Sequence, residues 1–339
     1  MSKIVSSQSG KPYTVVVPLP SLKRDDSAVS PGRWASDYHA PVLVDEVVRV
    51  LGGGGSVLDG TLGGGGHSAA LLESGARVTA LDRDPEAVRI ACERLAGEER
   101  AGRFRAFVAN YADIDSITAV AGEQFSGVLL DLGVSSHQLD DPRRGFSFRP
   151  SAPLDMRMGE DAALTAGELL NEGDELQLIR VFRDYADEPR ASRLAREIIR
   201  RRANRPFSTS DDLVGAIRAV LGPRSGPADF ARIFQAVRIE VNEELVGLAR
   251  ALPVLRERLS PLGTIAVIAY HSGEDRLVKQ TFRDWSVACI CPPLMPRCVC
   301  GGVARGAVLT KKAITASPTE LSRNPRARSA RLRAWRSAA

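Results

Sequence analysis

The stretch 57-VLDGTLGGGGHS-68 places an aspartate, Asp59, at the end of a short apolar run and follows it with four consecutive glycines and a histidine. The apolar run is typical of a buried β-strand, and the spacing of residues 68–75 is typical of a helix. Glycines between the two allow a sharp turn and let a ligand approach the backbone. A glycine run is also typical of a flexible linker, so a nucleotide-binding turn must be argued from the flanking sequence.

The sequence around this turn repeats the alternation of short apolar runs and helical patterns. We expect strands at residues 56–60, 77–84, 104–110, 125–133 and 260–272, and helices at residues 39–51 and 85–97. Strands that alternate with helices in this way predict a parallel sheet with helices on both faces, which is a Rossmann-like α/β fold. Its ligand crevice is expected at the carboxyl ends of the strands.

Residues 139–224 interrupt this pattern, because three segments within them, at 166–186, 191–203 and 209–221, have the spacing of amphipathic helices. The α/β pattern resumes with a long helical stretch at 230–259 and a late strand at 306–314. We therefore predict one α/β domain with a helical insertion. Its parts are a disordered leader at 1–33, a discontinuous α/β domain at 34–138 and 225–320, an all-helical, substrate-facing insertion at 139–224, and a basic C-terminal tail at 321–339.

The distribution of charge points to a polyanionic partner. Lys and Arg number 46 against 41 Asp and Glu, a net charge of +5, and the basic residues cluster at 191–205 and 324–336. A solvated helix face and a solvated tail are the alternative interpretation of these clusters. Since no apolar run reaches the roughly 18 residues that span a bilayer, and the first residues make a poor secretory signal, we expect a cytoplasmic protein.

Polar side chains end the five expected parallel strands. These residues are Asp59, Asp82, Asn110, Asp131 and His271. Any one of them alone is typical of a turn or a helix cap. Because the carboxyl ends of parallel strands meet at one edge of a sheet, the five together predict a single binding crevice.

Two nucleotide cofactors compete as the ligand of the glycine turn. Residues 64–69 match the dinucleotide pattern G-x-G-x-x-[GA], and Asp82 lies near the spacing of an acid that binds a ribose, which suggests NAD. Against NAD, Asp59 would repel a pyrophosphate at the helix N-terminus. S-adenosylmethionine has no phosphate and carries a cationic amino group, so an acid beside the turn favours this methyl donor. Asp82 would then accept the ribose hydroxyls, and Tyr111 would cover the adenine ring.

A set of longer motifs resembles one enzyme family. The segments HAPVLVDEVV, DGTLGGGGHS, ALDRDPEAV, GVLLDLGVSSHQLDDPRRGFSF, PLDMRM, RIFQAVRIEVNEEL, YHSGEDRLVK and NPRARSARLR follow in this order from His39 to Arg333. They resemble the MraW/RsmH family of bacterial S-adenosylmethionine-dependent methyltransferases. The resemblance implies a class I methyltransferase sheet and methylation of N4 of a cytidine in 16S ribosomal RNA, at the decoding centre of the small subunit.

The resemblance also implies site residues. Tyr111 stands where some members have phenylalanine, His137 where proline is common, and both Tyr270 and Gly273 differ from the FHSLEDR form. The residues that match the cofactor-binding set of the family are Gly65, Gly66, His67, Asp82, Tyr111, Asp131 and Gln138.

Methyl transfer to an exocyclic amine depends on alignment and on acceptors for the N–H groups, not on a metal. Asp131 lies where such an acceptor belongs, although it could instead serve only the cofactor. His271 is a second catalytic candidate that would contact the cytidine or a phosphate; the alternative is a structural histidine that bonds its own turn. Methylation at C5 of cytosine is disfavoured because no cysteine lies near the fourth strand. Two other functions stay open, an NAD-dependent oxidoreductase and a non-catalytic RNA-binding assembly factor.

Four of the five cysteines lie together near the C-terminus, as Cys289, Cys291, Cys298 and Cys300. Four thiolates around a tight turn are chemically able to hold a structural zinc ion, although C-x-C is a less usual spacing than C-x2-C. Reduced thiols and a redox pair are the alternatives. The metal content is therefore left undecided, and the oligomeric state is not indicated.

Overall fold

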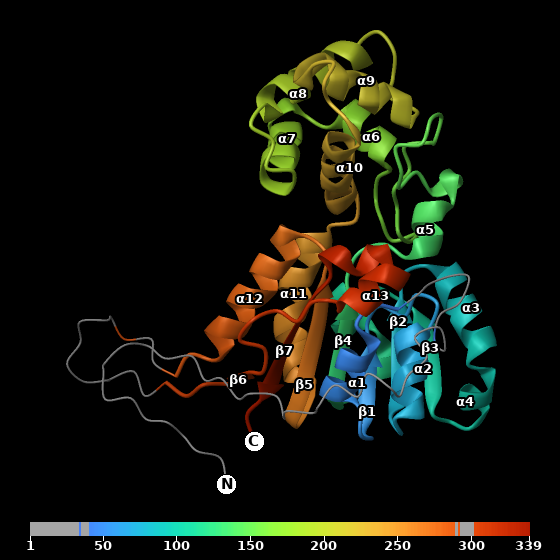
Figure 1. Cartoon of the computed structure of the whole chain (residues 1–339), viewed down its shortest axis with the longest axis vertical. Helices are drawn as coiled ribbons and strands as arrows, with labels where there is room; N and C mark the ends of the chain where they lie inside the picture. The colour runs from blue at the N-terminus through green and yellow to red at the C-terminus, as the bar shows by residue number, and fades with distance from the viewer. Residues whose placement is uncertain (1–33, 35–40, 289–290, 292–301) are drawn as a thin grey trace.

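The computed structural model describes Trp34, residues 41–288, Cys291 and residues 302–339. Its centre is a seven-stranded sheet with the order β3-β2-β1-β4-β5-β7-β6 (Figure 1). The first five strands along the chain pair in parallel, and β7 runs antiparallel to both of its neighbours. The strands are β1 (Ser56–Asp59), β2 (Arg77–Asp82), β3 (Phe104–Val108), β4 (Phe125–Asp131), β5 (Leu259–Ala269), β6 (Gly306–Val308) and β7 (Arg331–Ser337).

Helices cover both faces of the sheet, as predicted. Side chains of β1 and β4 alternate between the two faces, so that Val57 and Leu129 join one apolar core while Leu58 and Leu130 join the other. The first core is completed by α1 (Val44–Leu51), α2 (Gly66–Glu73) and α3 (Pro85–Arg94), with α4 (Ala96–Arg100) beyond it. The second is completed by α11 (Glu244–Glu257) and α12 (Ser272–Trp285). The Rossmann-like α/β fold is therefore confirmed.

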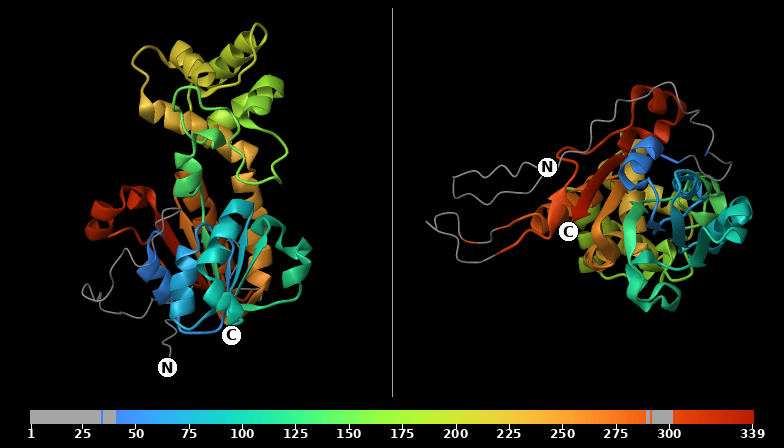
Figure 2. Two further views of the ribbon diagram at one scale, coloured as in Figure 1. Left: turned by 90° about the vertical axis from the view of Figure 1, so that its right-hand side faces the viewer. Right: turned by 90° about the horizontal axis from the view of Figure 1, so that it is seen from below.

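The interrupting segment contains helices but is not helical throughout, because residues 145–165 form no helix. Residues 139–224 form α6 (Ala166–Glu172), α7 (Glu175–Arg180), α8 (Ala191–Arg202) and α9 (Ser210–Leu221), with a π-helical turn at Val181–Tyr185 and only an isolated bridge between Pro153 and Thr209. Two views set these helices at one end of the molecule, beyond the sheet (Figures 1 and 2). They are preceded by α5 (Ser136–Asp140).

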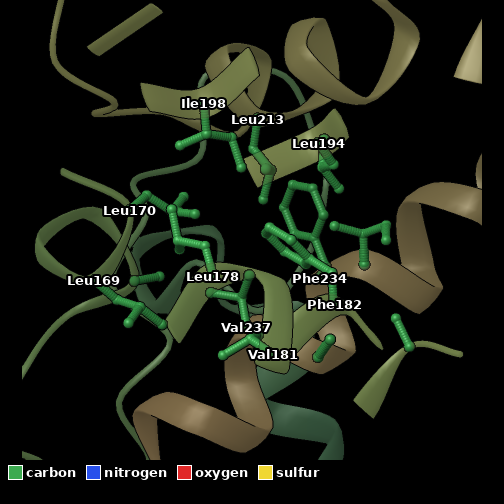
Figure 3. Close-up of a cluster of buried hydrophobic side chains, with 14 of the residues drawn as sticks. Leu169, Leu170, Leu178, Val181, Phe182, Leu194, Ile198, Leu213, Phe234 and Val237 are labelled. Carbon is green, nitrogen blue, oxygen red and sulfur yellow. The ribbon is translucent and has the colours of Figure 1, made fainter. Parts of the chain in front are cut away.

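The helical part has an apolar core of its own, which extends past residue 224. The long helical stretch divides at Asn242 and Glu243, where Glu243 has a φ of 50°, into α10 (Pro227–Val241) and α11. Helix α10 contributes Phe234 and Val237 to the core around Phe182 (Figure 3). Because this helix packs with α6–α9 rather than on the sheet, the helical part includes residues that we expected in the α/β domain.

The expected basic tail is wrong for residues 331–337. This segment is β7, which lies inside the sheet between β5 and β6. The Trp335 side chain is fully buried, and its indole N–H donates to Ser286 Oγ at 3.0 Å. The Arg333 guanidinium is also buried and binds both carboxylate oxygens of Asp275, at 2.6 and 3.1 Å. In the sequence alone, arginines among apolar residues are typical of a solvated tail, because the carboxylate that pairs with Arg333 lies far away in the chain. Ahead of it lie α13 (Pro318–Arg323) and a 3-10 turn at Pro325–Ser329.

Three further expectations concern the leader, membrane-spanning helices and the late strand. The leader at 1–33 lies outside the described residues. In the described part, no helix is long and apolar enough to cross a membrane. The late strand expected at 306–314 is present but short, because β6 covers residues 306–308 and beyond it Ile314 forms an isolated bridge with Leu332 of β7.

Trp335→Ala is expected to lower the free energy of unfolding by about 3–5 kcal/mol, because it empties a fully buried aromatic site in the middle of the sheet. Urea unfolding followed by circular dichroism measures the change. Arg328→Ala, at an exposed position a few residues earlier, is the matched control and is expected to change stability by less than about 0.5 kcal/mol. Equal stabilities of the two variants would contradict a structural role for β7.

Candidate active site

A cleft opens at the carboxyl ends of the parallel strands, between the sheet and the helical part. Its lining includes six of the seven residues predicted to bind the cofactor, namely Gly66, His67, Asp82, Tyr111, Asp131 and Gln138. Met158 and Asn242, from the helical side, line it as well. The predicted convergence of strand ends is therefore confirmed for β2, β3 and β4.

The glycine turn joins β1 to α2, and two of its glycines have positive φ. Gly63 has a φ of 50°, lines the cleft, and donates its N–H to Asp82 Oδ2 at 2.7 Å. Gly65 has a φ of 73° and does not line the cleft. A Cβ at Gly65 would lie 3.2 Å from the Cβ of Ala91 on α3. Gly65 thus allows α2 and α3 to pack closely, and its predicted contact with the cofactor stays a prediction.

Asp59 lies beneath the turn, not on the cleft. Its side chain is completely buried, with Oδ2 accepting from Ser68 Oγ at 2.7 Å and Oδ1 from the Thr61 N–H at 3.2 Å. Burial raises the pKa of Asp59, while these hydrogen bonds and His67 act to lower it. The expectation that Asp59 shares the crevice with the other strand ends is wrong; its carboxylate instead holds the glycine turn against β1.

Asp82 ends β2 and does face the cleft. Its two carboxylate oxygens accept the N–H groups of Gly63, at 2.7 Å, and Asp84, at 2.9 Å. Burial is the main cause that raises the pKa of Asp82 to about 6, and the two backbone hydrogen bonds oppose it. Asp82 is thereby held in one orientation at the edge where a ribose is expected in this fold.

Asp131 ends β4 and faces the cleft from the neighbouring strand. Its Oδ1 accepts the Tyr270 hydroxyl at 2.9 Å, and its Oδ2 lies 3.6 Å from His67 Nδ1. The backbone N–H of Asp131 donates to Thr61 Oγ1 at 2.6 Å. Burial raises the pKa of Asp131 to about 6, while His67 and the Tyr270 hydroxyl act in the opposite direction.

Gln138 connects the cleft to the helical part. Its Oε1 accepts the Ser135 N–H at 3.0 Å, and its Nε2 donates to Asp84 Oδ2 at 2.9 Å. The same Asp84 oxygen accepts from Arg144 Nη1 at 2.8 Å. Gln138 lines the cleft as predicted, but the contacts of its amide also make it part of a link between β2 and the segment that leads into the helices.

His271 is a helix cap in the structure. Its Nδ1 accepts the N–H groups of Gly273 and Glu274 at the start of α12, and its Nε2 lies 3.2 Å from Glu274 Oε1. It is not among the residues that line the cleft. The geometry thus matches the alternative of a structural histidine that bonds its own turn, and it does not favour the predicted catalytic role.

Several residues near the cleft were missed from the sequence. Tyr270 sits within a segment that we noted, but nothing in the sequence assigned its hydroxyl to Asp131. Asp161 accepts two hydrogen bonds from Arg83, at 2.9 and 2.7 Å, and one from Asn110 at 2.9 Å. Asn242 bridges Met156 and Met158 through its amide. These partners lie 51 to 139 positions apart in the chain, so no local signal could have paired them.

Carboxylates outnumber basic groups on the cleft lining. Among the described residues, Arg83 and Arg250 are its arginines, and each pairs with an aspartate. The carboxylates of the lining are Asp82, Asp131, Glu243, Glu244 and Glu274. Such a lining disfavours a pyrophosphate and suits a cationic ligand. Among the residues that the structure describes, no cysteine lines the cleft.

The structure leaves the zinc hypothesis untested. Cys291 is described, while Cys289, Cys298 and Cys300 lie outside the described residues. Within the described ranges, no group of three or more histidine, cysteine, aspartate or glutamate side chains is arranged to hold a metal ion.

The fold and the cleft define a class of protein. A mostly parallel sheet of this strand order, with a reversed strand next to β5, a glycine turn after β1 and a carboxylate ending β2, is the Rossmann-like fold of class I S-adenosylmethionine-dependent methyltransferases. Residues 36–338 match the profile of the MraW methylase family. The chain belongs to this family and is an S-adenosylmethionine-dependent methyltransferase.

Relatives of the chain are similar over nearly their whole length. A protein of Gemmatimonas aurantiaca named "Ribosomal RNA small subunit methyltransferase H" is 61% identical over 309 residues, which cover 91% of this chain and 98% of the relative. A relative of the same name from Heliobacterium mobile is 44% identical, with 87% and 97% covered. Solved structures are more distant. An rRNA methylase from Streptococcus thermophilus aligns with 11% identity and a TM-score of 0.38, over 87% of this chain and 94% of that one.

Asp131→Asn is expected to stabilise the ligand-free protein at neutral pH. The amide retains an oxygen for the Tyr270 hydroxyl and carries no buried charge. The pKa of Asp131 rises from 3.8 to about 6 on folding, so wild-type stability falls as the pH increases through this window. The free energy of unfolding of Asp131→Asn therefore exceeds that of the wild type by an amount that grows as the pH rises from 3.8 to about 6 and reaches about 1–3 kcal/mol. Urea unfolding near pH 4 and near pH 7.5 measures it.

Asp113→Asn is the control for this prediction, because Asp113 is an exposed carboxylate that pairs with Arg250. Its effect on stability is expected to stay within about 0.5 kcal/mol at both pH values. A variant at Asp131 that is less stable than the wild type near pH 7.5 would show that the cost of burying the carboxylate does not dominate at this site.

Proposed function

We propose that the chain transfers a methyl group from S-adenosylmethionine to N4 of a cytidine in 16S ribosomal RNA, at the decoding centre of the small subunit, and that it acts in the cytoplasm. The observation that carries the ribosomal substrate is the 61% identity, over 98% of its length, to a relative named as a small-subunit ribosomal RNA methyltransferase. The choice of N4 and of the decoding centre rests on the family resemblance of residues 127–148.

The cleft fits the methyl donor by the chemistry of its lining. The Asp82 carboxylate, held by two backbone N–H groups, would bind the ribose hydroxyls, and the Tyr111 ring would cover the adenine. Gly66 and His67 begin α2 where the donor would pass the chain, and Gln138 closes the cleft from α5. The bound donor supplies an electrophilic methyl group on a sulfonium, and the carboxylates of the lining suit its positive charge.

The remaining task for the protein is to hold the target amine. The lone pair of a cytosine amino group is delocalised into the ring, so an acceptor of its N–H groups helps the nitrogen to become nucleophilic. Asp131 supplies a carboxylate on the cleft lining, and residues 133–135 line the same cleft. A cysteine nucleophile, which methylation at C5 would need, is missing from the described lining. These features support transfer to an exocyclic nitrogen.

Neither rival function is favoured by an observation. An NAD-dependent oxidoreductase is at odds with membership of the methylase family and with an acidic cleft lining. A non-catalytic assembly factor would have no need for the carboxylates Asp82 and Asp131, whose burial costs free energy.

The decisive experiment is incubation of the enzyme and labelled S-adenosylmethionine with small ribosomal subunits from a strain that lacks this activity, followed by mass spectrometry of nucleosides. We expect labelled N4-methylcytidine in the 16S RNA. Subunits from the parent strain, which are already methylated, are the control and should accept no label. Label in protein, in DNA or at C5 of cytosine would refute the proposal.

Helix α8 offers a surface for the RNA phosphates. Arg193, Arg196 and Arg200 recur at helical spacing along its exposed side, at the end of the molecule formed by the helical part (Figure 1). Arg200 shares Glu197 with Arg201, so the stripe is partly neutralised. A target inside a folded particle must be held by contacts outside the cleft, and phosphate contacts of this kind set position rather than sequence.

The double variant Arg193→Ala, Arg196→Ala is expected to raise KM for small subunits and leave kcat unchanged, because phosphate contacts add binding and do not touch the reacting atoms. The slope of log KM against log salt should fall by about one for each arginine removed. Arg100→Ala on α4, exposed at the opposite end of the molecule, is the control (Figure 1). An unchanged salt slope in the double variant would remove α8 from the RNA interface.

A further inference from the structure

The carboxylate of Asp131 is contacted by side chains from two other elements. Tyr270, which follows β5, donates its hydroxyl to Oδ1 at 2.9 Å. His67, on α2, places Nδ1 at 3.6 Å from Oδ2. All three residues line the cleft, and the Asp131 and His67 side chains are 8% and 5% exposed. The orientation of this carboxylate is therefore set by the tertiary structure and not by β4 alone.

The protonation of these neighbours follows from their other partners. The Nε2 atom of His67 lies 2.8 Å from the carbonyl oxygen of Val42, which can only accept a hydrogen bond, so this nitrogen carries a hydrogen. Burial and the nearby carboxylates raise the pKa of Tyr270 well above its usual value, so its hydroxyl keeps its proton and donates a hydrogen bond to Asp131. The titratable groups that act on Asp131 are His67 from α2, Tyr270 after β5, Asp59 from β1 and Glu274 from α12.

We propose that Tyr270 is a positioning residue for methyl transfer: its hydroxyl fixes the rotamer of Asp131 and keeps that carboxylate ionised, so that it accepts the N–H and then the proton of the target amino group. This inference rests on the proposed function, since it takes an exocyclic amine as the target. Tyr270 does not itself touch the reacting atoms, because it acts through the carboxylate.

The role of the carboxylate follows from the balance of the step. The amino nitrogen forms the new N–C bond while the S–C bond of the donor breaks and its electron pair stays on sulfur. The nitrogen then carries a positive charge and one surplus proton. Asp131 takes this proton and releases it to solvent, which restores the carboxylate. A carboxylate that is already protonated can do neither, so activity must fall at low pH.

Removal of the Tyr270 hydroxyl changes this pH dependence in a defined direction. A hydrogen bond to a carboxylate favours its ionised form, and burial acts the other way. Without the hydroxyl, the carboxylate must lose its proton at a higher pH. From the usual strength of a hydrogen bond to a charged group, we expect the acidic limb of the pH profile to move up by about one pH unit.

The test is the pH profile of single-turnover methylation of unmethylated small subunits at saturating S-adenosylmethionine, with Tyr270→Phe beside the wild type. We expect the acidic limb of the variant at a higher pH, a rate about tenfold lower on that limb, and a rate that recovers toward the wild type at alkaline pH. Tyr185→Phe is the matched control. It also loses a half-buried tyrosine hydroxyl that is hydrogen-bonded, to Arg180, but Tyr185 lies in the helical part, so its limb should not move.

A second substitution makes the test independent of folding defects in Tyr270→Phe. Replacement of Tyr270 by 3-fluorotyrosine keeps the ring and the hydroxyl but makes the hydroxyl a stronger donor, so the acidic limb should move to lower pH. A purely structural role predicts the same limb for the wild type and both variants, and that result would overturn the inference. A wild type that forms no N4-methylcytidine at any pH would instead refute the proposed function, and the inference with it.

Discussion

Three neighbouring parallel strands of this sheet end in aspartates, and the burial of these carboxylates is the constraint on which the site depends. Each needs partners, because a buried charge without hydrogen bonds costs several kcal/mol. Asp59 has Ser68 and the turn backbone, Asp82 has two backbone N–H groups, and Asp131 has a tyrosine hydroxyl and a histidine. The glycine turn thus donates hydrogen bonds to these carboxylates, in addition to leaving room for a cofactor.

The helical part completes the cleft through a few long-range polar contacts. Asp84 accepts hydrogen bonds from Gln138 and Arg144, and Asp161 binds Arg83 across the ends of β2 and β3. These contacts position Met158 and Asn242 on the cleft lining. A sheet without the helical part would therefore present an open edge, whereas the whole chain presents a walled site in which water is partly replaced by fixed dipoles.

The regular parts of the fold were predictable because each has a local signal. The strands at 56–59 and 125–131 are short apolar runs typical of strands buried on both faces, and α3 begins at Pro85 after the cap Asp84. The last strand, β7, was not predictable, because Arg331, Arg333 and Arg336 make its sequence resemble a solvated basic segment. Its role in the sheet becomes clear only once the pairing with Asp275 and the core around Trp335 are known. The boundary of the helical part was also misplaced, because the helical spacing of α10 does not reveal which core it joins.

The site residues fall into the same two groups, those with a local signal in the sequence and those without one. The sequence by itself determined that Asp82 and Asp131 end parallel strands and face one crevice, because strand period and the α/β alternation are local properties. Only the tertiary structure decided that Asp59 and Gly65 support the turn, that His271 caps a helix, and that Tyr270 holds Asp131. The physical reason is that hydrogen-bond partners and close approaches depend on how distant segments pack. Tyr270 and Asp131 are 139 positions apart in the chain, and no local pattern between them indicates their contact.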